Sequence, residues 1–197
     1  MQIITSGNKN SPFYNPVFQE KYLSKYINLR YEIFTSLNRP HYTPEPESYD
    51  LYDDTSFIYF VDKEVLGGRR IVLHKPNSNT KLKTEQSILK PISKVYPYLN
   101  TENLTYAELG GLCFHPSIQG QNLSQKLYEL TFVMLQQLDC DFFIAETVPE
   151  NTDRMIKNAQ LNGVKQIVQK PEDTSEDGFH DYRIFMSFKE KSELDLQ

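Results

Sequence analysis

The apolar residues of this chain fall partly at helical spacing and partly in short continuous runs, which predicts a mixture of helices and strands. We expect helices at 21–37, 85–99, 123–138 and 151–161, and strands at 2–5, 57–61, 65–73, 105–114, 141–148, 164–168 and 182–188. In this order some strands follow one another directly, as in a hairpin, and others are separated by helices. This favours a mixed α/β sheet over a doubly wound fold in which strands and helices alternate regularly. One domain at 1–188 and a charged tail at 189–197 are predicted.

Local signals refine these elements. Asn38-Arg39-Pro40 is expected to end the first helix, and Asp62-Lys63-Glu64 to join two hairpin strands. A Pro-rich acidic segment at 44–54 is predicted to be a loop. Two glycines, Gly110 and Gly111, lie inside a predicted strand and indicate a bulge or a close backbone approach. Asn151 is the expected N-cap of the last helix.

Composition narrows the classes of function. The 197 residues carry a net charge of −5, so a protein that binds nucleic acid through a basic face is not expected. With a mean hydropathy of −0.56 and an N-terminus unlike a secretion signal, we expect a cytoplasmic protein with no membrane span. The two cysteines, Cys113 and Cys140, are predicted to be reduced and buried. The four histidines lack metal-ligand spacing, so no metal is expected.

The junction between a strand and a helix at 112–124 is the main candidate for binding chemistry. It reads LCFHPSIQGQNLS, and the helix that follows would present free backbone N–H groups and a positive dipole end, which favour phosphate. Neither GxxxxGK[ST] nor GxGxxG occurs in the chain, so no other phosphate-binding motif competes with it. The simpler alternative is an ordinary strand–turn–helix with a surface loop.

This junction resembles motif A of the GNAT N-acyltransferases, in which an apolar strand, often followed by His-Pro, leads into Gln/Arg-x-x-Gly-x-Gly/Ala. The resemblance implies a single-domain α/β GNAT fold, with a mixed, mostly antiparallel central sheet flanked by helices. It also implies binding of acetyl-CoA or a longer acyl-CoA as acyl donor. Asn122 and Ser124 replace residues that the family favours as Gly and a small residue, but Asn tolerates left-handed backbone and Ser is small.

The same resemblance assigns cofactor contacts. Main-chain groups of Leu112, Cys113 and Phe114 are implied to meet the thioester and pantetheine arm, whereas backbone amides downstream hold the pyrophosphate. The implied pyrophosphate-binding residues are Gln119, Gly120, Gln121, Asn122, Leu123 and Ser124. The strand and helix around Asn151 resemble motif B and add Asn151 to the implied cofactor-binding residues. Many members carry a Tyr acid in that helix, but none occurs between Asn151 and Gly163.

The N-terminal half resembles the acyl-homoserine-lactone synthases and N-acyl amino acid synthases, which share the GNAT fold. Arg30, Asp50, Asp53, Arg70 and Glu108 fall on family positions, in the family's order. The chain departs from the pattern in two places: it has glycine three residues after the acidic strand residue, where those synthases have Arg, and it contains no Trp.

Together these features predict an acyltransferase that moves an acyl group from a thioester to a small amine or an amino-acid-like acceptor. Glu108 is the candidate general base, with a strand carboxylate that faces solvent or pairs with an Arg as the alternative. Asp50 and Asp53 are candidates to hold a cationic acceptor, unless they belong to a solvated acidic loop; Arg30 could pair with them, and Arg70 completes the candidate acceptor site. Two other functions remain open: a synthase that takes its acyl chain from acyl carrier protein, and a non-catalytic module that binds acyl-CoA.

Overall fold

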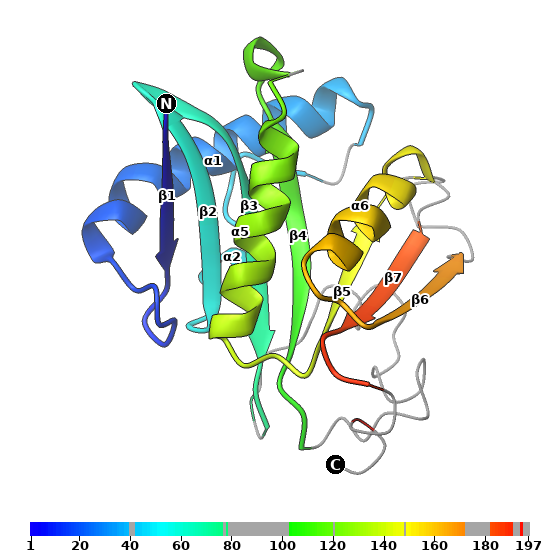
Figure 1. Cartoon of the computed structure of the whole chain (residues 1–197). Helices are drawn as coiled ribbons and strands as arrows, with labels where there is room; N and C mark the ends of the chain where they lie inside the picture. Colours follow the sequence, from blue (N-terminus) through cyan, green and yellow to red (C-terminus); the bar gives the residue numbers. More distant parts are fainter. Residues whose placement is uncertain are drawn as a thin grey trace. The chain divides into compact units, whose positions relative to one another are not determined.

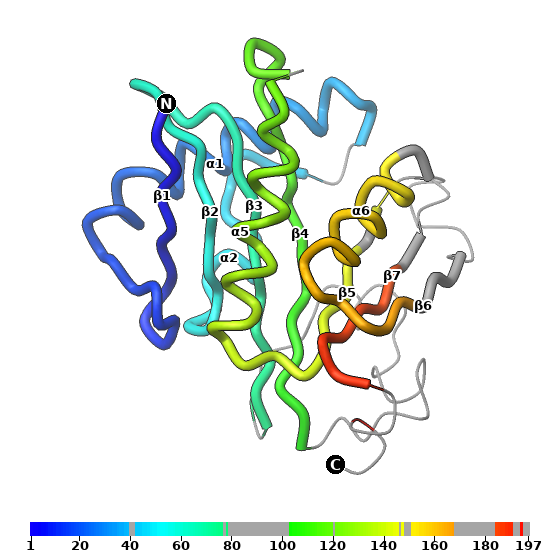
Figure 2. Tube along the Cα trace, in the orientation of Figure 1, coloured from blue at the N-terminus to red at the C-terminus, as the bar shows by residue number. Residues whose placement is uncertain are grey.

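The computed structural model describes residues 1–39, 42–76, 78, 103–119, 121–147, 149–171, 182–190 and 194. In chain order the elements are β1 (Gln2–Gly7), α1 (Pro16–Ser36), α2 (Ser48–Leu51), β2 (Thr55–Asp62), β3 (Glu64–His74), β4 (Tyr106–Phe114), η1 (Pro116–Ile118), α5 (Leu123–Gln137), β5 (Phe142–Thr147), α6 (Pro149–Leu161), β6 (Gln166–Pro171) and β7 (Tyr182–Ser187). Figures 1 and 2 trace these elements. The predicted helix at 85–99 lies outside the described residues.

The strands form one sheet in the order β1-β2-β3-β4-β5-β7-β6. Pairs β1–β2, β2–β3, β5–β7 and β7–β6 are antiparallel. The predicted class, a mixed α/β fold with a mostly antiparallel sheet, is therefore confirmed. By its internal contacts the chain divides into a first unit, Met1–Val72 with Leu109–Leu127, and a second unit, Leu73–Glu108 with Tyr128–Gln197.

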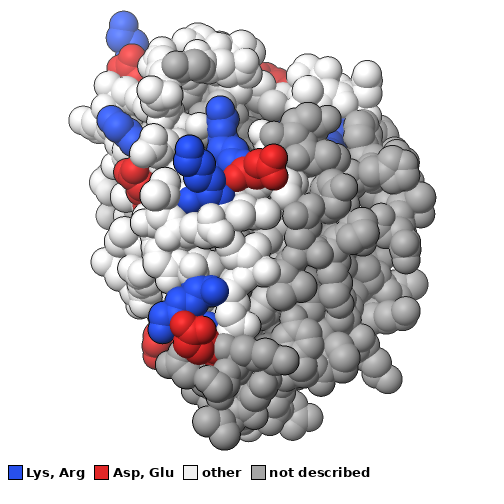
Figure 3. All heavy atoms as spheres, turned by 45° about the vertical axis from the view of Figure 1, so that its right-hand side comes forward, with Lys and Arg blue, Asp and Glu red and all other residues white. Residues whose placement is uncertain are grey.

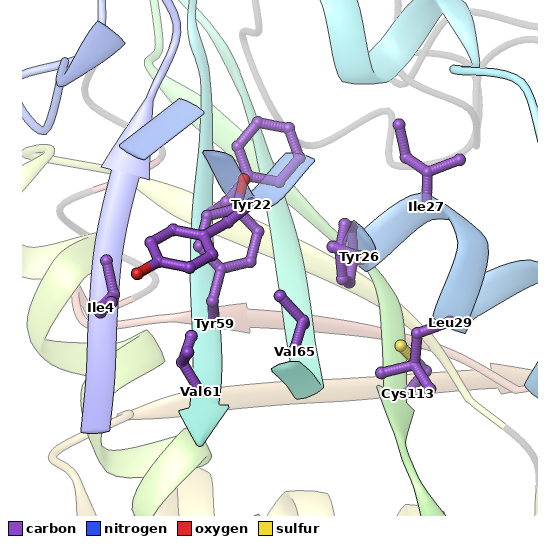
Figure 4. Packing of buried hydrophobic residues seen from close by; sticks show 10 residues of the cluster. Ile4, Tyr22, Tyr26, Ile27, Leu29, Tyr59, Val61, Val65 and Cys113 are labelled. Atoms are coloured by element: carbon purple, nitrogen blue, oxygen red, sulfur yellow. The ribbon is translucent and has the colours of Figure 1, made fainter. Parts of the chain in front are cut away.

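In the first unit, α1 crosses one face of the β1–β2–β3 sheet (Figure 1). Register pairs Ile4 with Tyr59 and Tyr59 with Gly68, which aligns apolar side chains under the helix. Tyr22 and Tyr26 of α1 pack into this layer with Tyr59, as Figure 4 shows. This aromatic core fixes the helix against the sheet because large rings bury much apolar surface and pack in defined orientations.

The helix α1 begins earlier than the hydrophobic spacing predicts. Asn15 is its N-cap, with the side-chain oxygen accepting from the N–H of Phe18 at 3.1 Å, and Pro16 occupies the first helical position. The prediction of a start at residue 21 was wrong because the first turn carries exposed Val17, outside the apolar stripe. An Asn-Pro pair is a start signal independent of that stripe. The predicted stop is confirmed: the helix ends at Ser36, Leu37 is the C-cap, and left-handed Asn38 (φ 57°) follows it.

In the second unit, β7 pairs antiparallel with both β5 and β6, and α6 contacts β7. Its core is aromatic: the ring of Phe142 stacks on Tyr106 with centroids 4.7 Å apart and lies 5.0 Å from Phe185. Ser187 donates from its hydroxyl to the backbone oxygen of Asp141 at 2.8 Å, which joins the ends of β7 and β5. The strands predicted at 141–148 and 182–188 are confirmed.

Three predicted boundaries differ in the structure. The last helix begins at Pro149, so Asn151 lies inside its first turn and is not the N-cap. Strand β6 runs from Gln166 to Pro171, so it starts two residues and ends three residues later than predicted. The acidic segment contains a short helix, α2, where a loop was predicted; the carboxylate of Asp50 accepts from the N–H of Glu47 at 2.9 Å and closes that turn. Among the described residues, no helix is both long and apolar enough to cross a membrane.

Candidate functional site

A buried charge cluster joins α1, α2 and β3 in the first unit. The Arg30 guanidinium binds Asp50 in bidentate fashion, with N–O distances of 2.9 and 2.7 Å. Arg70 donates from Nη1 to Asp50 at 2.9 Å and to Glu47 at 2.7 Å. Glu47 also lies 3.5 Å from the Arg30 guanidinium. Two cations therefore face two anions, and the cluster is neutral as a whole.

All four acceptor directions of the Asp50 carboxylate are occupied. Oδ1 accepts from Arg30 and Arg70, and Oδ2 accepts from Arg30 and the N–H of Glu47. Burial by itself would raise the pKa of Asp50, but the hydrogen bonds from Arg30 and the charge of Arg70 outweigh burial and hold the pKa below its usual value. Asp50 is fully buried, so it is a charged interior residue and has no lone pair left for a substrate.

Asp53 lies apart from this cluster. Its side chain is exposed and lines an open hollow of about 410 Å³, together with Lys9 and Glu20. The segment that carries Asp53 is held by Asn8, whose side-chain N–H groups donate to the backbone oxygens of Asp50 and Tyr52 at 2.9 and 2.6 Å. Of the two aspartates singled out in the sequence, only Asp53 is accessible to a solute.

The two glycines of β4 mark a close approach of the backbone, as predicted. Gly111 has a φ of 62°, and a Cβ placed there would lie 2.2 Å from the hydroxyl oxygen of Tyr26. A Cβ on Gly110 would approach the Arg70 guanidinium to 3.3 Å. Two consecutive residues thus face the same side of the sheet, which is the geometry of a β-bulge. Tyr26 donates from its hydroxyl to the carbonyl of Gly111 at 2.6 Å.

Glu108 lies on the same strand, two residues before Gly110, and is buried with 3% of its surface exposed. Side chains two apart on a strand share a face, so Glu108 and the glycine position point to the same side of β4. The strand position predicted for Glu108 is confirmed; its role as a base is taken up below as a proposal.

The strand β4 continues into the predicted cofactor turn. Leu112, Cys113 and Phe114 end the strand, and the Phe114 ring packs on Phe60 with centroids 5.7 Å apart. Cys113 is a buried free thiol, as is Cys140, and burial raises the pKa of Cys113 to about 12. The prediction of reduced, buried cysteines is confirmed, and Cys113 stays a protonated thiol, which is a poor nucleophile.

The turn itself is ordered by local hydrogen bonds. His115 accepts at Nδ1 from the N–H of Ser117 at 3.2 Å, and Pro116 begins the short helix η1. Gln119, Gln121 and Asn122 are exposed, and α5 begins with Leu123, followed by Ser124. Gly120 lies outside the described residues. The backbone of 121–124 is thus at the N-terminal end of α5, as the motif requires.

Asn122 adopts a left-handed backbone, with φ at 55°. A left-handed backbone favours glycine, and Asn is among the non-glycine residues that tolerate it. We predict that Asn122→Gly leaves the melting temperature nearly unchanged, whereas Asn122→Val lowers the free energy of unfolding by about 1–2 kcal/mol. Chemical denaturation of both variants checks this prediction, and equal effects of Gly and Val would contradict it.

The second unit contributes fewer candidates. Asn151 is exposed in the first turn of α6. Asn158, further along the helix, is buried and donates from its side chain to the backbone oxygen of Arg154 at 2.8 Å. Within the part of the chain that the structure describes, no group of three or more His, Cys, Asp or Glu residues could hold a metal ion.

Two residues of the site were missed in the sequence. Glu47 completes the charge cluster, but it stands in an acidic segment in which no single carboxylate is marked by its spacing. Tyr26 falls within the helix predicted at 21–37, but its hydrogen-bond partner lies 85 residues away in the sequence. The helical spacing of apolar residues indicates that Tyr26 is buried, but it cannot indicate that the Gly111 carbonyl accepts its hydrogen bond.

No family model and no curated protein sequence matches the chain, whereas solved structures do. A CoA-dependent acyl-homoserine lactone synthase, BjaI, solved with SAM and isopentyl-CoA, is similar over 98% of this chain and 86% of its own, with a TM-score of 0.64 and 16% identity. An acyl-CoA N-acyltransferase from Pseudomonas aeruginosa matches over 93% and 97%, with a TM-score of 0.59 and 14% identity.

FeeM, an N-acyl amino acid synthase from uncultured soil microbes, matches over 91% of this chain and 95% of its own, with a TM-score of 0.60 and 11% identity. At these identities the comparisons establish the fold. The GNAT fold predicted from residues 112–124 is therefore confirmed, and the lactone and N-acyl amino acid synthases suggested by the N-terminal half are among its structural neighbours.

Proposed function

We propose that the chain is an acyl-CoA-dependent N-acyltransferase, which moves an acyl group from a CoA thioester to an amine. The observation that carries this proposal is the path of β4 through its left-handed bulge into the turn at 115–122 and the N-terminus of α5. Backbone N–H groups at a helix N-terminus bind phosphate groups. Among structural neighbours, BjaI was solved with isopentyl-CoA, which supports the same class of donor for this fold.

The chemistry assigns roles to the described residues. The Gln119 N–H already donates to the carbonyl of Pro116 at 3.2 Å, so the backbone amides of 121–124 hold the pyrophosphate. Main-chain groups of 112–114 meet the thioester arm. The amine nitrogen attacks the thioester carbon, the C–N bond forms, and the C–S bond breaks with its electron pair going to sulfur. Glu108 takes the proton that the amine loses, directly or through a water molecule. No residue is assigned to protonate the CoA thiolate, because α6 contains no Tyr.

The buried charge cluster has a different part in this proposal. Arg30, Asp50 and Arg70 do not touch the acceptor; they hold α2 against α1 and β3, beside the glycines of β4. Asp50 does not contact the substrate, contrary to the sequence-based prediction, because all four acceptor positions of its carboxylate are occupied. Asp53, exposed at the edge of the open hollow, stays the candidate contact for a cationic acceptor.

A thermal-shift titration with CoA, acetyl-CoA and a long-chain acyl-CoA tests the donor. A ligand at 100 times its dissociation constant stabilises the native state by about 2.7 kcal/mol, which corresponds to a rise in Tm of roughly 5–10 °C for a chain of this size. The ligand that gives the larger shift at equal concentration identifies the preferred acyl length. Absence of a shift with all three compounds would refute the proposal.

Glu108→Gln tests the base. We expect kcat for thiol release to fall by about 100-fold or more, because general bases contribute factors of this size, whereas the thermal shift with acetyl-CoA is retained. The matched control is Glu64→Gln, which removes an exposed carboxylate on the β2–β3 hairpin that pairs with Lys25. Full turnover by Glu108→Gln would eliminate this residue as the base.

A second candidate is a synthase that uses acyl carrier protein and makes an acyl-homoserine lactone or an N-acyl amino acid. The observation that favours it is the convergence of Arg30, Asp50 and Arg70, three positions that carry the resemblance to those synthases. On the described part of the face in Figure 3, basic and acidic side chains alternate in small groups, whereas docking of an acidic carrier requires a basic patch.

The two candidates are separated by supplying one acyl group either on CoA or on acyl carrier protein. SAM or a free amino acid serves as acceptor, and the products are identified by mass spectrometry. Transfer from the carrier alone would favour the synthase. Binding of acyl-CoA with no transfer to any acceptor would instead indicate a non-catalytic module with the same fold.

A further inference from the structure

Tyr26 is fixed in the first unit from several sides. The residue is fully buried, and its ring meets Phe57 and Tyr59 edge-on, with centroids 6.0 and 5.7 Å apart. Gly68 lies directly beneath the ring, where an added Cβ would come within 2.9 Å of a ring carbon. Packed among these residues (Figure 4), the ring has one available position, so its hydroxyl group has one available direction.

That place is the carbonyl of Gly111 in the β4 bulge, 2.6 Å from the Tyr26 hydroxyl oxygen. Burial raises the pKa of Tyr26 well above its usual value, so the hydroxyl stays protonated and acts as the donor. The carbonyl is a backbone group whose direction is set by the left-handed φ of Gly111. The hydrogen bond thus fixes Tyr26 and the Gly111 carbonyl relative to each other, and a Cβ at position 111 would clash with the Tyr26 hydroxyl.

The fixed carbonyl determines the direction of the next amide. The peptide between Gly111 and Leu112 is planar and trans, so the N–H of Leu112 points opposite to the carbonyl of Gly111. Strand alternation agrees: His115 donates its N–H to the backbone oxygen of Leu66 on β3 at 2.8 Å, so the amides of 112 and 114 are directed to the other edge of β4.

We propose that Tyr26 is a positioning residue, which aims the N–H of Leu112 at the thioester carbonyl oxygen of bound acyl-CoA. The inference rests on the proposed function. As the amine forms the C–N bond, the carbonyl oxygen gains negative charge, and a preoriented N–H stabilises that charge more than a mobile one does. The charge disappears when the C–S bond breaks. Tyr26 touches neither donor nor acceptor and acts only through the peptide of residues 111 and 112.

The test is Tyr26→Phe, which removes one oxygen atom and retains the ring that packs on Gly68. Its matched control is Tyr22→Phe, the same change one turn earlier on α1, in the same aromatic core. Both variants are compared with the wild type by infrared spectroscopy of bound acetyl-CoA labelled with ¹³C at the carbonyl. Steady-state kinetics of thiol release supply the second readout, and circular dichroism confirms that each variant is folded.

The wild type and Tyr22→Phe are expected to shift the carbonyl band to lower frequency than free acetyl-CoA, whereas Tyr26→Phe returns it toward the free value. We expect kcat to fall about tenfold in Tyr26→Phe, with KM for acetyl-CoA changed less than about twofold. Equal bands and equal kcat in Tyr26→Phe and wild type would overturn the inference alone. If the wild type binds none of CoA, acetyl-CoA and long-chain acyl-CoA, the proposed function is overturned and the inference with it.

Discussion

Asp50→Asn is expected to lower the free energy of unfolding by about 3–5 kcal/mol, since removing one member of a buried ion pair leaves its partners uncompensated. In the native protein Asp50 receives four hydrogen bonds and balances Arg30 and Arg70. An asparagine at this position is neutral and carries an N–H₂ group that can only face other donors. Two guanidinium groups would then share the single carboxylate of Glu47.

Urea denaturation at about pH 7 measures this effect, with Asp53→Asn as the matched control. Asp53 is an exposed aspartate three residues along the chain, so its replacement is expected to change stability by less than about 0.5 kcal/mol. Equal stabilities of the two variants would show that the charge cluster does not hold the first unit together.

The stability difference between wild type and Asp50→Asn is expected to depend on pH. The pKa of Asp50 is lower in the folded protein than the ordinary value of 3.8, so its contribution to stability is complete above that value. It is lost as the pH falls from 3.8 through the lower folded pKa, because the carboxylate is then protonated. The gap in stability between wild type and Asp50→Asn should therefore narrow in this acidic range. A gap that stays constant would contradict the ionised state of Asp50.

Much of the fold could be predicted from the sequence because it depends on patterns that repeat along an element. The short apolar runs of β2 and β3, and the Asp62–Glu64 connection between them, are local signals, and they predicted the observed hairpin. The start of α1 was missed because Val17 lies on the exposed side, where periodicity carries no information. The end of a helix is determined by its capping residues, and these do not follow the apolar pattern.

The site was only partly predictable for a different reason. The resemblance brought Arg30, Asp50 and Arg70 to attention, but the sequence around Asp50 is polar and acidic, which suggests a solvated loop. Burial of that carboxylate depends on two arginines supplied by other elements, 20 residues away in each direction. Likewise, the glycines of β4 indicated that some group approaches the strand closely. That group is the Tyr26 hydroxyl, and its position depends on how α1 packs on the sheet. Such pairings depend on tertiary structure.

The packing of Tyr26 on Gly111 leads to the second large expected effect. Gly111→Ala should lower the free energy of unfolding by about 2–4 kcal/mol, because it combines a left-handed residue with an overpacked contact. The added Cβ would lie 2.2 Å from the Tyr26 hydroxyl oxygen, while the other nearby atoms are at 3.5 Å, an ordinary contact distance. The clash therefore comes from the hydroxyl group alone.

A double-mutant cycle isolates that clash. In the Tyr26→Phe background the hydroxyl is absent, so Gly111→Ala should retain only the left-handed cost of about 1–2 kcal/mol. Gly163→Ala is the matched control: Gly163 also has a positive φ, 85°, but no atom lies within 4 Å of its added Cβ. Its cost should be the same with Tyr or Phe at position 26. If the Gly111 and Tyr26 substitutions instead add within about 0.5 kcal/mol, the two residues are not in contact, and Tyr26 has no means of orienting the peptide that follows the bulge.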